Sequence, residues 1–258
     1  MLFLLSPAKS LDFEPPAAAV PHTEPLFVKQ SAKLIKVLKT KAPQEIASLM
    51  DLSDNLAALN VARYQAWSSK FTATNSKQAM LAFDGDVYDG LVAKTLKTAQ
   101  LNWAQDHVCI LSGLYGVLRP LDWMQAYRLE MGTSLITDCG KNLYQFWGAQ
   151  LSEYLNTRLE TDRTPVVVNL ASQEYFKAVD KKVLKARVIE CVFEDWKSGQ
   201  YKIISFFAKR ARGLMARFAI EHKIGTPAGL KKFNVDGYQF APEASAPDRL
   251  VFRRKIAA

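Results

Sequence analysis

Apolar and polar positions along the chain predict short strands mixed with helices. Met1 to Leu5 is a continuous apolar run, typical of a strand that is buried on both faces. Further apolar or β-branched runs predict strands over 108–111, 165–170, 188–193 and 201–204. The turn Lys197-Ser198-Gly199 lies between the last two runs, so they are expected to form an antiparallel hairpin.

Helices are expected where apolar residues recur every three or four positions. The pattern is clearest over 205–223 and over 24–41, where lysines fill the opposite face. Shorter segments with the same pattern are 43–50, 54–68, 87–98, 143–159 and 173–179. Residues 6–16 and the Pro- and Ala-rich stretch up to Pro21 are expected to be a loop. Since no linker interrupts the chain, we predict one α/β (α+β) domain over 1–258, a mixed sheet surrounded by helices.

The cysteines and the apolar runs bear on where the protein works. Cys109, Cys139 and Cys191 are far apart and form no CxxC pair, so neither a disulfide framework nor a cysteine zinc site is indicated. Lys9 follows the first apolar run too soon for a signal peptide, and no run approaches the ~20 residues that cross a bilayer. We expect a cytoplasmic protein with no membrane partner, and a monomer fits the sequence.

Positive charge is concentrated near the carboxyl end. The net charge is +9, and residues 201–258 hold 12 Lys and Arg against 4 Asp and Glu. Clustered cations gain free energy by displacing counterions from phosphates, so a polyanion partner is one interpretation. A basic surface that only aids solubility is the other. The Arg253-Arg254-Lys255 tail is interpreted as a solvated end.

The helix predicted over 205–223 carries much of this charge. Opposite its apolar stripe lie Lys209, Arg210, Arg212, Gly213 and Arg217, which we interpret as a basic ridge. Gly213 in its middle is expected to let a phosphate approach the backbone closely. Such a ridge has no means of reading bases, so contacts to DNA phosphates without sequence choice are expected.

Polar clusters follow three of the predicted strands. In open α/β sheets, ligands bind at the carboxyl ends of the strands. If the strands are parallel neighbours, Lys9, Arg119, Asn169 and Ser172 are expected to converge in a cleft. The alternative is that these residues only end strands and cap helices.

Acidic residues offer weaker candidates. Arg128 and Glu130 are two apart, and in an extended segment they face the same side as an acid/base pair or a structural ion pair. Asp84, Asp86 and Asp89 have oxygens that suit Mg²⁺, but a solvated turn and helix start is favoured there. No GxSxG, Walker A or GxGxxG sequence occurs, and the three histidines match no metal-ligand spacing. We expect no metal and no cofactor.

Taken together, these motifs resemble the bacterial family of the peroxide stress protein YaaA. The matching segments run in order along nearly the entire chain: SPAKSLDF (6–13), FDGDVYDGL (83–91), LSGLYGVLRPLD (111–122), YRLEMG (127–132), NLASQEYF (169–176) and KRARGLMARF (209–218). The resemblance implies a fold particular to that family, a positively charged cleft, a helix-hairpin-helix element and binding to double-stranded or branched DNA. It also implies protection against peroxide, linked to less free intracellular iron.

Two functional hypotheses follow, and they overlap. The first is a DNA-binding stress protein whose phosphate contacts come from a set of basic residues and one glycine: Lys9, Arg119, Arg128, Lys209, Arg210, Arg212, Gly213 and Arg217. The second is an enzyme acting on a nucleotide or nucleobase in the cleft, with site residues Lys9, Arg119, Arg128, Glu130, Asn169 and Ser172. The helix-hairpin-helix is placed at 43–68 rather than 205–232, although the acidic Asp51 and Asp54 would repel DNA there.

Overall fold

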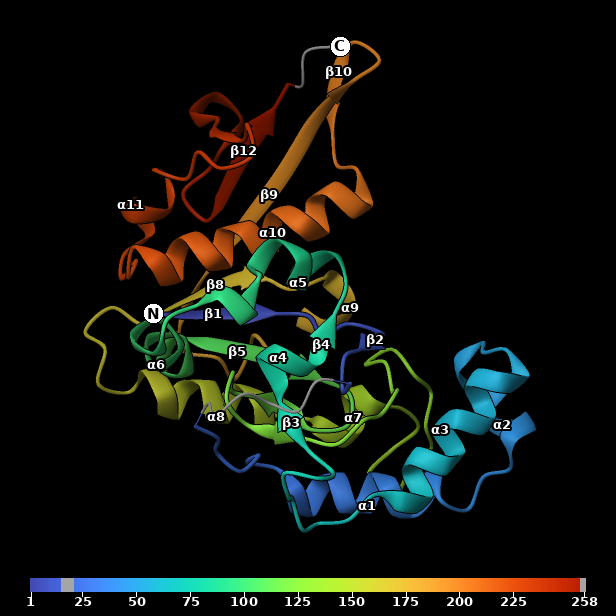
Figure 1. The fold of residues 1–258 in the computed structure, drawn as a ribbon. Coiled ribbons are helices and arrows are strands. Elements are labelled where there is room, and N and C mark those ends of the chain that lie inside the picture. The colour runs from blue at the N-terminus through green and yellow to red at the C-terminus, as the bar shows by residue number, and fades with distance from the viewer. Residues whose placement is uncertain (15–20, 256–258) are drawn as a thin grey trace.

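A mixed eight-stranded sheet runs through the computed structural model, which describes residues 1–14 and 21–255 (Figure 1). Five strands, β12, β9, β8, β1 and β5, are parallel neighbours in that order, and β6, β10 and β11 add antiparallel pairs. The strands are β1 (Leu2–Leu5), β5 (Val108–Ser112), β6 (Gly116–Leu118), β8 (Val166–Leu170), β9 (Arg187–Lys197), β10 (Gln200–Lys202), β11 (Gln239–Phe240) and β12 (Arg249–Arg254). The predicted α/β fold with a mixed sheet is confirmed.

Strand β1 is buried along its whole length between β5 and β8. Leu5 pairs with Ile110 of β5 on one side and with Leu170 of β8 on the other. The carboxyl ends of the three strands therefore meet at one edge of the sheet, as the polar clusters in the sequence predicted.

Helices and two small sheets surround the large one. The helices are α1 (Val28–Leu38), α2 (Pro43–Met50), α3 (Asp54–Ala66), α4 (Ala79–Ala82), α5 (Asp86–Leu91), α6 (Thr98–His107), α7 (Leu143–Trp147), α8 (Gln150–Leu159), α9 (Gln173–Phe176), α10 (Ser205–Glu221) and α11 (Pro227–Leu230), with 3₁₀ turns at Ala93–Thr95 and Pro242–Ala244. The small sheets pair β2 (Ser10–Leu11) with β4 (Phe83–Asp84) and β3 (Lys77–Gln78) with β7 (Trp123–Met124). Of the predicted loop before the first helix, residues 15–20 lie outside the described residues.

Two backbone positions explain where helix boundaries differ from expectation, and two more form the predicted hairpin turn. The helix predicted over 87–98 ends at Leu91 because Val92 adopts a left-handed conformation, and a separate helix, α6, starts at Thr98. The helix predicted over 143–159 is split into α7 and α8 at Gly148, which also has positive φ. In the β9–β10 hairpin, Ser198 and Gly199 both have positive φ, as a tight two-residue turn requires.

Arg253 and Arg254 are part of the sheet, so the interpretation of the tail as a solvated end was wrong for these two residues, while Lys255 is exposed. β12 pairs in parallel with β9, which aligns Arg254 with Asp195. The buried Arg254 guanidinium donates to Asp195 at 2.7 Å and to Asp236 at 2.7 Å. Arg253 forms ion pairs with Glu194 and Glu243, each at 2.9 Å. These carboxylates neutralise two of the cations that the sequence left free.

Helix α10 packs directly against α5, and Figure 1 shows the two side by side. Gly213 of α10 and Gly90 of α5 allow this close approach. A β-carbon on Gly213 would overlap the Val87 carbonyl oxygen, and one on Gly90 would overlap the Arg210 carbonyl oxygen. Helices α1 to α3 lie at the end of the molecule away from α10 (Figure 1). A tight turn at Asp51 joins α2 to α3.

Candidate functional site

A cleft of about 440 Å³ opens where β1 and β8 end. Its lining comes from five parts of the chain: the loop after β1, the turn before α5 with the start of that helix, the segment that contains Glu130, the segment after β8, and α10. It includes five residues that the sequence singled out as site candidates: Lys9, Glu130, Ser172, Lys209 and Arg212. Of the four residues expected to converge at the carboxyl ends of the strands, Lys9 and Ser172 line this cleft.

Two serines connect the ends of β1 and β8 at the base of the cleft. The Ser172 backbone N–H donates to the Ser6 hydroxyl oxygen at 2.8 Å, and the two hydroxyl oxygens are 3.4 Å apart. Ser172 also caps α9, because its hydroxyl accepts from the Tyr175 N–H. Tyr88 of α5 donates to the Ser6 carbonyl at 3.1 Å. Ser172 therefore both caps α9 and lines the cleft, so the two alternatives drawn from the sequence hold together for this residue.

Glu130 lies between two cations and has one free oxygen. Its Oε1 is 3.0 Å from an Arg128 guanidinium nitrogen and 3.4 Å from the Lys9 ammonium. The other oxygen, Oε2, is buried and has no hydrogen-bond partner among the described residues. Arg128 and Glu130 form the ion pair that their spacing allowed, and the Arg128 carbonyl accepts a hydrogen bond from the buried Tyr64 hydroxyl.

Lys209 and Arg212 enter the cleft from one face of α10. The Lys209 ammonium is 3.8 Å from Asp86, and the Lys209 side chain is half exposed. Arg212 is half-buried and forms no ion pair or hydrogen bond with the described part of the chain. Burial lowers its pKa, while Glu190 and Cys191 have the opposite effect. Arg212 is thus a partly buried cation with no carboxylate within ion-pair distance among the described residues.

Basic and acidic side chains both line the cleft. Lys9, Lys209 and Arg212 share it with a larger acidic group: Asp84, Asp86, Glu130 and Glu174. Asp86 and Asp89 belong to the first turn of α5, as the helix-start interpretation of this segment expected. Within 1–14 and 21–255, no three His, Cys, Asp or Glu residues are grouped as a metal site would need. The lining is thus mixed in charge rather than uniformly basic.

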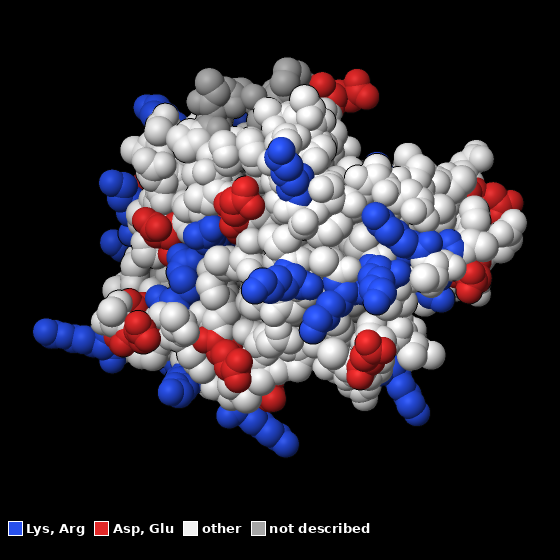
Figure 2. Space-filling view, turned by 90° about the horizontal axis from the view of Figure 1, so that it is seen from below, with Lys and Arg blue, Asp and Glu red and all other residues white. Residues whose placement is uncertain are grey.

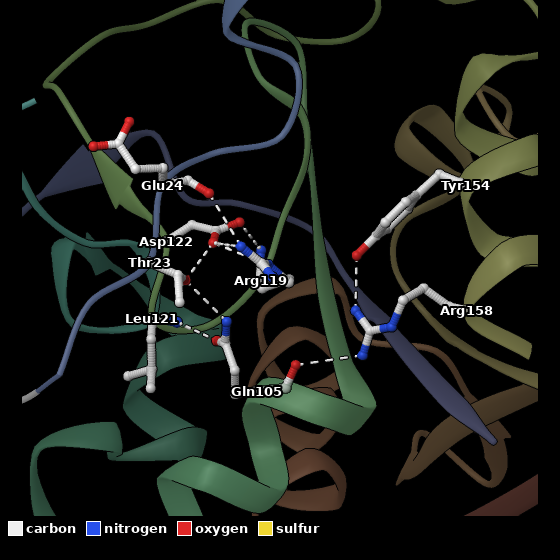
Figure 3. A network of polar contacts seen from close by, with 8 residues as sticks. All are labelled: Thr23, Glu24, Gln105, Arg119, Leu121, Asp122, Tyr154 and Arg158. Atoms are coloured by element: carbon white, nitrogen blue, oxygen red, sulfur yellow. Dashed lines mark hydrogen bonds and ion pairs between the residues drawn. The ribbon is translucent and has the colours of Figure 1, made fainter. Parts of the chain in front are cut away.

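Arg119 lies away from the cleft, in the polar network of Figure 3. It follows β6, and because β6 runs antiparallel to β5, the chain has returned toward the amino ends of the parallel strands. There the Arg119 guanidinium donates to Asp122 Oδ1 at 2.8 and 3.0 Å and to the Glu24 carbonyl at 3.1 Å. The expectation that it joins Lys9 and Ser172 was wrong for this reason.

Asn169 is also turned away from the cleft. Successive side chains of a strand point to opposite faces, and Asn169 lines a second hollow with Gln173, Lys177 and Glu190. Its side-chain oxygen accepts a hydrogen bond from the Ala171 N–H at 3.0 Å, directly after the last residue of β8. The sequence pattern gave the strand end correctly but not the face.

The basic ridge expected on α10 is divided among several contacts. Arg210 pairs with Asp236 at 2.7 Å, and Arg217 pairs with Glu221 at 2.8 Å while donating to the Leu91 carbonyl. Gly213 is buried against α5, so a phosphate has no access to its backbone, contrary to expectation. Charge type was readable from the sequence. The partner of Arg210, Asp236, comes from a distant segment, whereas Glu221 is four residues from Arg217 on the same helix.

Comparison with known proteins agrees with this arrangement of motifs. The family model described as "Peroxide stress protein YaaA" matches residues 1–244. The chain belongs to this family. It is 70% identical over 255 residues to a UPF0246 protein of Albidiferax ferrireducens, covering 99% of this chain and 98% of the relative. A UPF0246 protein of Polaromonas naphthalenivorans is 71% identical over 254 residues, 98% of each chain, and one of Paracidovorax citrulli is 66% identical over 258 residues, 100% of each.

The family match spans both sides of the cleft, since Lys9, Glu130, Ser172 and Arg212 all fall within residues 1–244. Glu174 and Tyr175 of the lining were not among the sequence candidates. Their position directly after a strand end, in the first turn of a helix, was the available signal. Across the described residues, no helix has both the length and the apolar character that crossing a membrane takes.

Proposed function

We propose that this YaaA-family protein works in the cytoplasm under peroxide stress by binding DNA through its phosphates, and that helix α1 is the principal contact surface. One observation carries the proposal. Lys29, Lys33 and Lys36 are exposed along one face of α1, and none of them has an ion pair among the described residues. Positions i, i+4 and i+7 place the three ammonium groups in a stripe.

The surroundings of this lysine stripe support the proposal. Figure 2 shows the face on which α1 lies, where Lys and Arg side chains gather in the middle. Lys39 extends the group and donates to the Trp67 carbonyl at 3.3 Å, and the first turn of α1 contains no acidic residue. Clustered, unpaired lysines release counterions when they meet phosphates, which gives affinity without sequence preference.

The α2–α3 hairpin adjoins the stripe but presents an acidic turn. Asp51 and Asp54 are exposed there, and Asp51 takes the left-handed position that glycine often occupies. Since carboxylates repel phosphates, we place the DNA contact on α1 and give the hairpin a supporting position. Its identity as the helix-hairpin-helix of the family stays a prediction.

Salt-dependent binding of duplex DNA tests the proposal. The triple variant Lys29→Gln, Lys33→Gln, Lys36→Gln is expected to weaken binding by at least about tenfold near 0.1 M salt and to flatten the salt dependence. The matched control is Lys97→Gln, Lys182→Gln, Lys185→Gln, which removes the same charge from scattered exposed sites. Equal loss in both variants would mean that net charge alone acts, and no binding by the unmodified protein would refute the proposal.

The link to free iron is a separate part of the proposal. If DNA binding underlies the peroxide phenotype, cells carrying the α1 triple variant should lose protection and regain chelatable iron. Cells carrying the scattered control should not. Protection and iron levels that stay normal with the α1 variant would separate the stress role from this surface.

A further inference from the structure

The cleft contains one cation and one buried acceptor that have no partner among the described residues. Arg212 is a half-buried cation without an ion pair or hydrogen bond in the described residues, and Glu130 Oε2 is a buried acceptor without a donor. Leaving the buried Oε2 unpaired costs free energy, whereas the Arg212 guanidinium still reaches solvent in the cleft and is available to an anion. A site with both features indicates a ligand that supplies an anion at one end and a donor at the other.

From this pair we infer that the cleft binds a nucleoside monophosphate. The phosphate would lie against Arg212 and Lys209, and an N–H or O–H of the nucleoside would donate to Glu130 Oε2. The inference concerns a different end of the molecule from α1, and it does not depend on DNA binding there.

The anion end of the ligand follows from the α10 side chains. Arg212 and Lys209 are three residues apart on one helix, so their charged groups point into the same part of the cleft. The guanidinium fork binds phosphate through two parallel hydrogen bonds, and the flexible ammonium adds a point charge. The hydroxyls of Ser6 and Ser172 line the same cleft and offer further donors.

The donor end of the ligand follows from how Glu130 is held. Lys9 and Arg128 both contact Oε1, which fixes the orientation of the carboxylate. Oε2 is therefore a fixed acceptor, suited to a base amino group or a sugar hydroxyl. A ligand that carries only an anion would leave this acceptor empty.

Size and charge balance fit the same ligand. About 440 Å³ is within the range of small-molecule sites and too small for a duplex. The cleft lining has more acidic than basic side chains, which would oppose the continuous phosphate chain of DNA but accommodates one phosphate at the Arg212 end. A mononucleotide carries one phosphate at one end and several hydrogen-bond donors on its sugar and base.

Titration calorimetry with the full chain tests the inference. The probes are AMP, GMP, CMP and UMP, with inorganic phosphate and adenosine as partial ligands. At least one mononucleotide should bind about tenfold or more tightly than either partial ligand, because both ends contribute. Binding of inorganic phosphate alone, or of no mononucleotide, would overturn the inference.

Variants distinguish the two ends of the site. Arg212→Gln should weaken mononucleotide binding by about tenfold or more through loss of charge-assisted hydrogen bonds, and Arg163→Gln, an exposed arginine elsewhere, should not. Glu130→Gln should weaken the mononucleotide while leaving inorganic phosphate unchanged.

Two further measurements keep these outcomes separate from unfolding and from the α1 proposal. Thermal unfolding checks each variant, and Lys209→Gln, at a half-exposed position, gives a second reading with little risk to the fold. The α1 triple variant should keep mononucleotide affinity, and Arg212→Gln should keep DNA affinity. Unchanged mononucleotide binding in both Arg212→Gln and Lys209→Gln would overturn the inference.

Discussion

Gly213 of α10 lies directly against the Val87 carbonyl of α5, so that the two helices meet with backbone on backbone. Both α5 and α10 contribute to the cleft, through Asp86 and Val87 on one side and Lys209 and Arg212 on the other. The glycine contact therefore sets the separation of two walls of the candidate site. In the KRARG segment, the glycine serves helix packing while its neighbours supply charge.

Gly213→Ala is expected to destabilise the protein by about 1–3 kcal/mol, because the added methyl group forces the helices apart. Thermal unfolding measures the change. Gly225→Ala is the matched control, since its added β-carbon has no described atom within 4 Å beyond its chain neighbours. Equal stability of the Gly213 variant and the parent would show that the helices separate without cost.

Arg217→Ala should lower the free energy of unfolding by about 1–3 kcal/mol, because several hydrogen bonds are lost at once. Its guanidinium donates to the Leu91 and Val92 carbonyls at 3.0 and 3.1 Å and to the Thr95 hydroxyl at 2.8 Å. These contacts hold the end of α5 where Val92 turns left-handed.

Arg217→Lys separates this role from a simple need for charge. Lysine keeps the cation but lacks the planar fork, so denaturant unfolding should still show a loss of stability. If the lysine variant is as stable as the parent and only the alanine variant loses DNA binding, Arg217 would instead contact DNA phosphates, as expected from the sequence.

The sequence predicted the elements whose signal is local. The buried run Met1–Leu5, the hairpin at Ser198-Gly199 and the helix over 205–223 all have strong short-range patterns, and all are present. The helix breaks at Val92 and Gly148 were not predicted. Gly148 is a local signal for a helix end that was passed over, whereas a valine in the left-handed conformation has no signal in the sequence. β12 was missed because its apolar residues are flanked by arginines whose partners lie in β9 and beyond.

The same limit applied to the candidate site. Lys9 and Ser172 were placed correctly because they follow strands that pair in parallel. Arg119 was misplaced because the direction of β6 decides which end of the sheet it reaches, and three residues give no signal of direction. The free oxygen of Glu130 depends on Lys9 and Arg128 approaching the other one, which only the folded chain reveals.

Asp122→Asn should destabilise the fold by about 3 kcal/mol, because it leaves the Arg119 guanidinium without its charged partner in a largely buried place. Asp122 is fully buried and accepts from the Thr23 hydroxyl at 2.6 Å and from the Arg119 backbone N–H at 2.8 Å, contacts that fasten the chain before α1 (Figure 3). Asp248→Asn is the control, since its ion pair with Arg187 is exposed and should contribute less than about 1 kcal/mol. Chemical unfolding measures the loss of stability in both variants. Similar losses would show that burial does not make the Asp122 contacts more important than the exposed ion pair.

Thiol reagents should distinguish one accessible cysteine from two protected ones. Cys139 is exposed, whereas Cys109 and Cys191 are buried. Burial raises the pKa of Cys109 and of Cys191 from 9.0 to about 12, because a thiolate is poorly solvated inside the protein. In the native protein, a thiol reagent should therefore modify one cysteine, and Cys139→Ser should abolish the fast reaction.

The same pKa shifts predict how stability depends on pH. The folded state keeps both thiols protonated above the pKa of the unfolded chain, so their favourable contribution is intact below about pH 9 and declines as pH rises toward about 12. Unfolding measured between pH 8 and 11 in a Cys109→Ala, Cys191→Ala double variant should thus show a shallower loss than in the parent. A second fast-reacting thiol in the native protein at pH 8, or identical slopes in the two proteins, would show that these side chains are not sequestered as the structure describes.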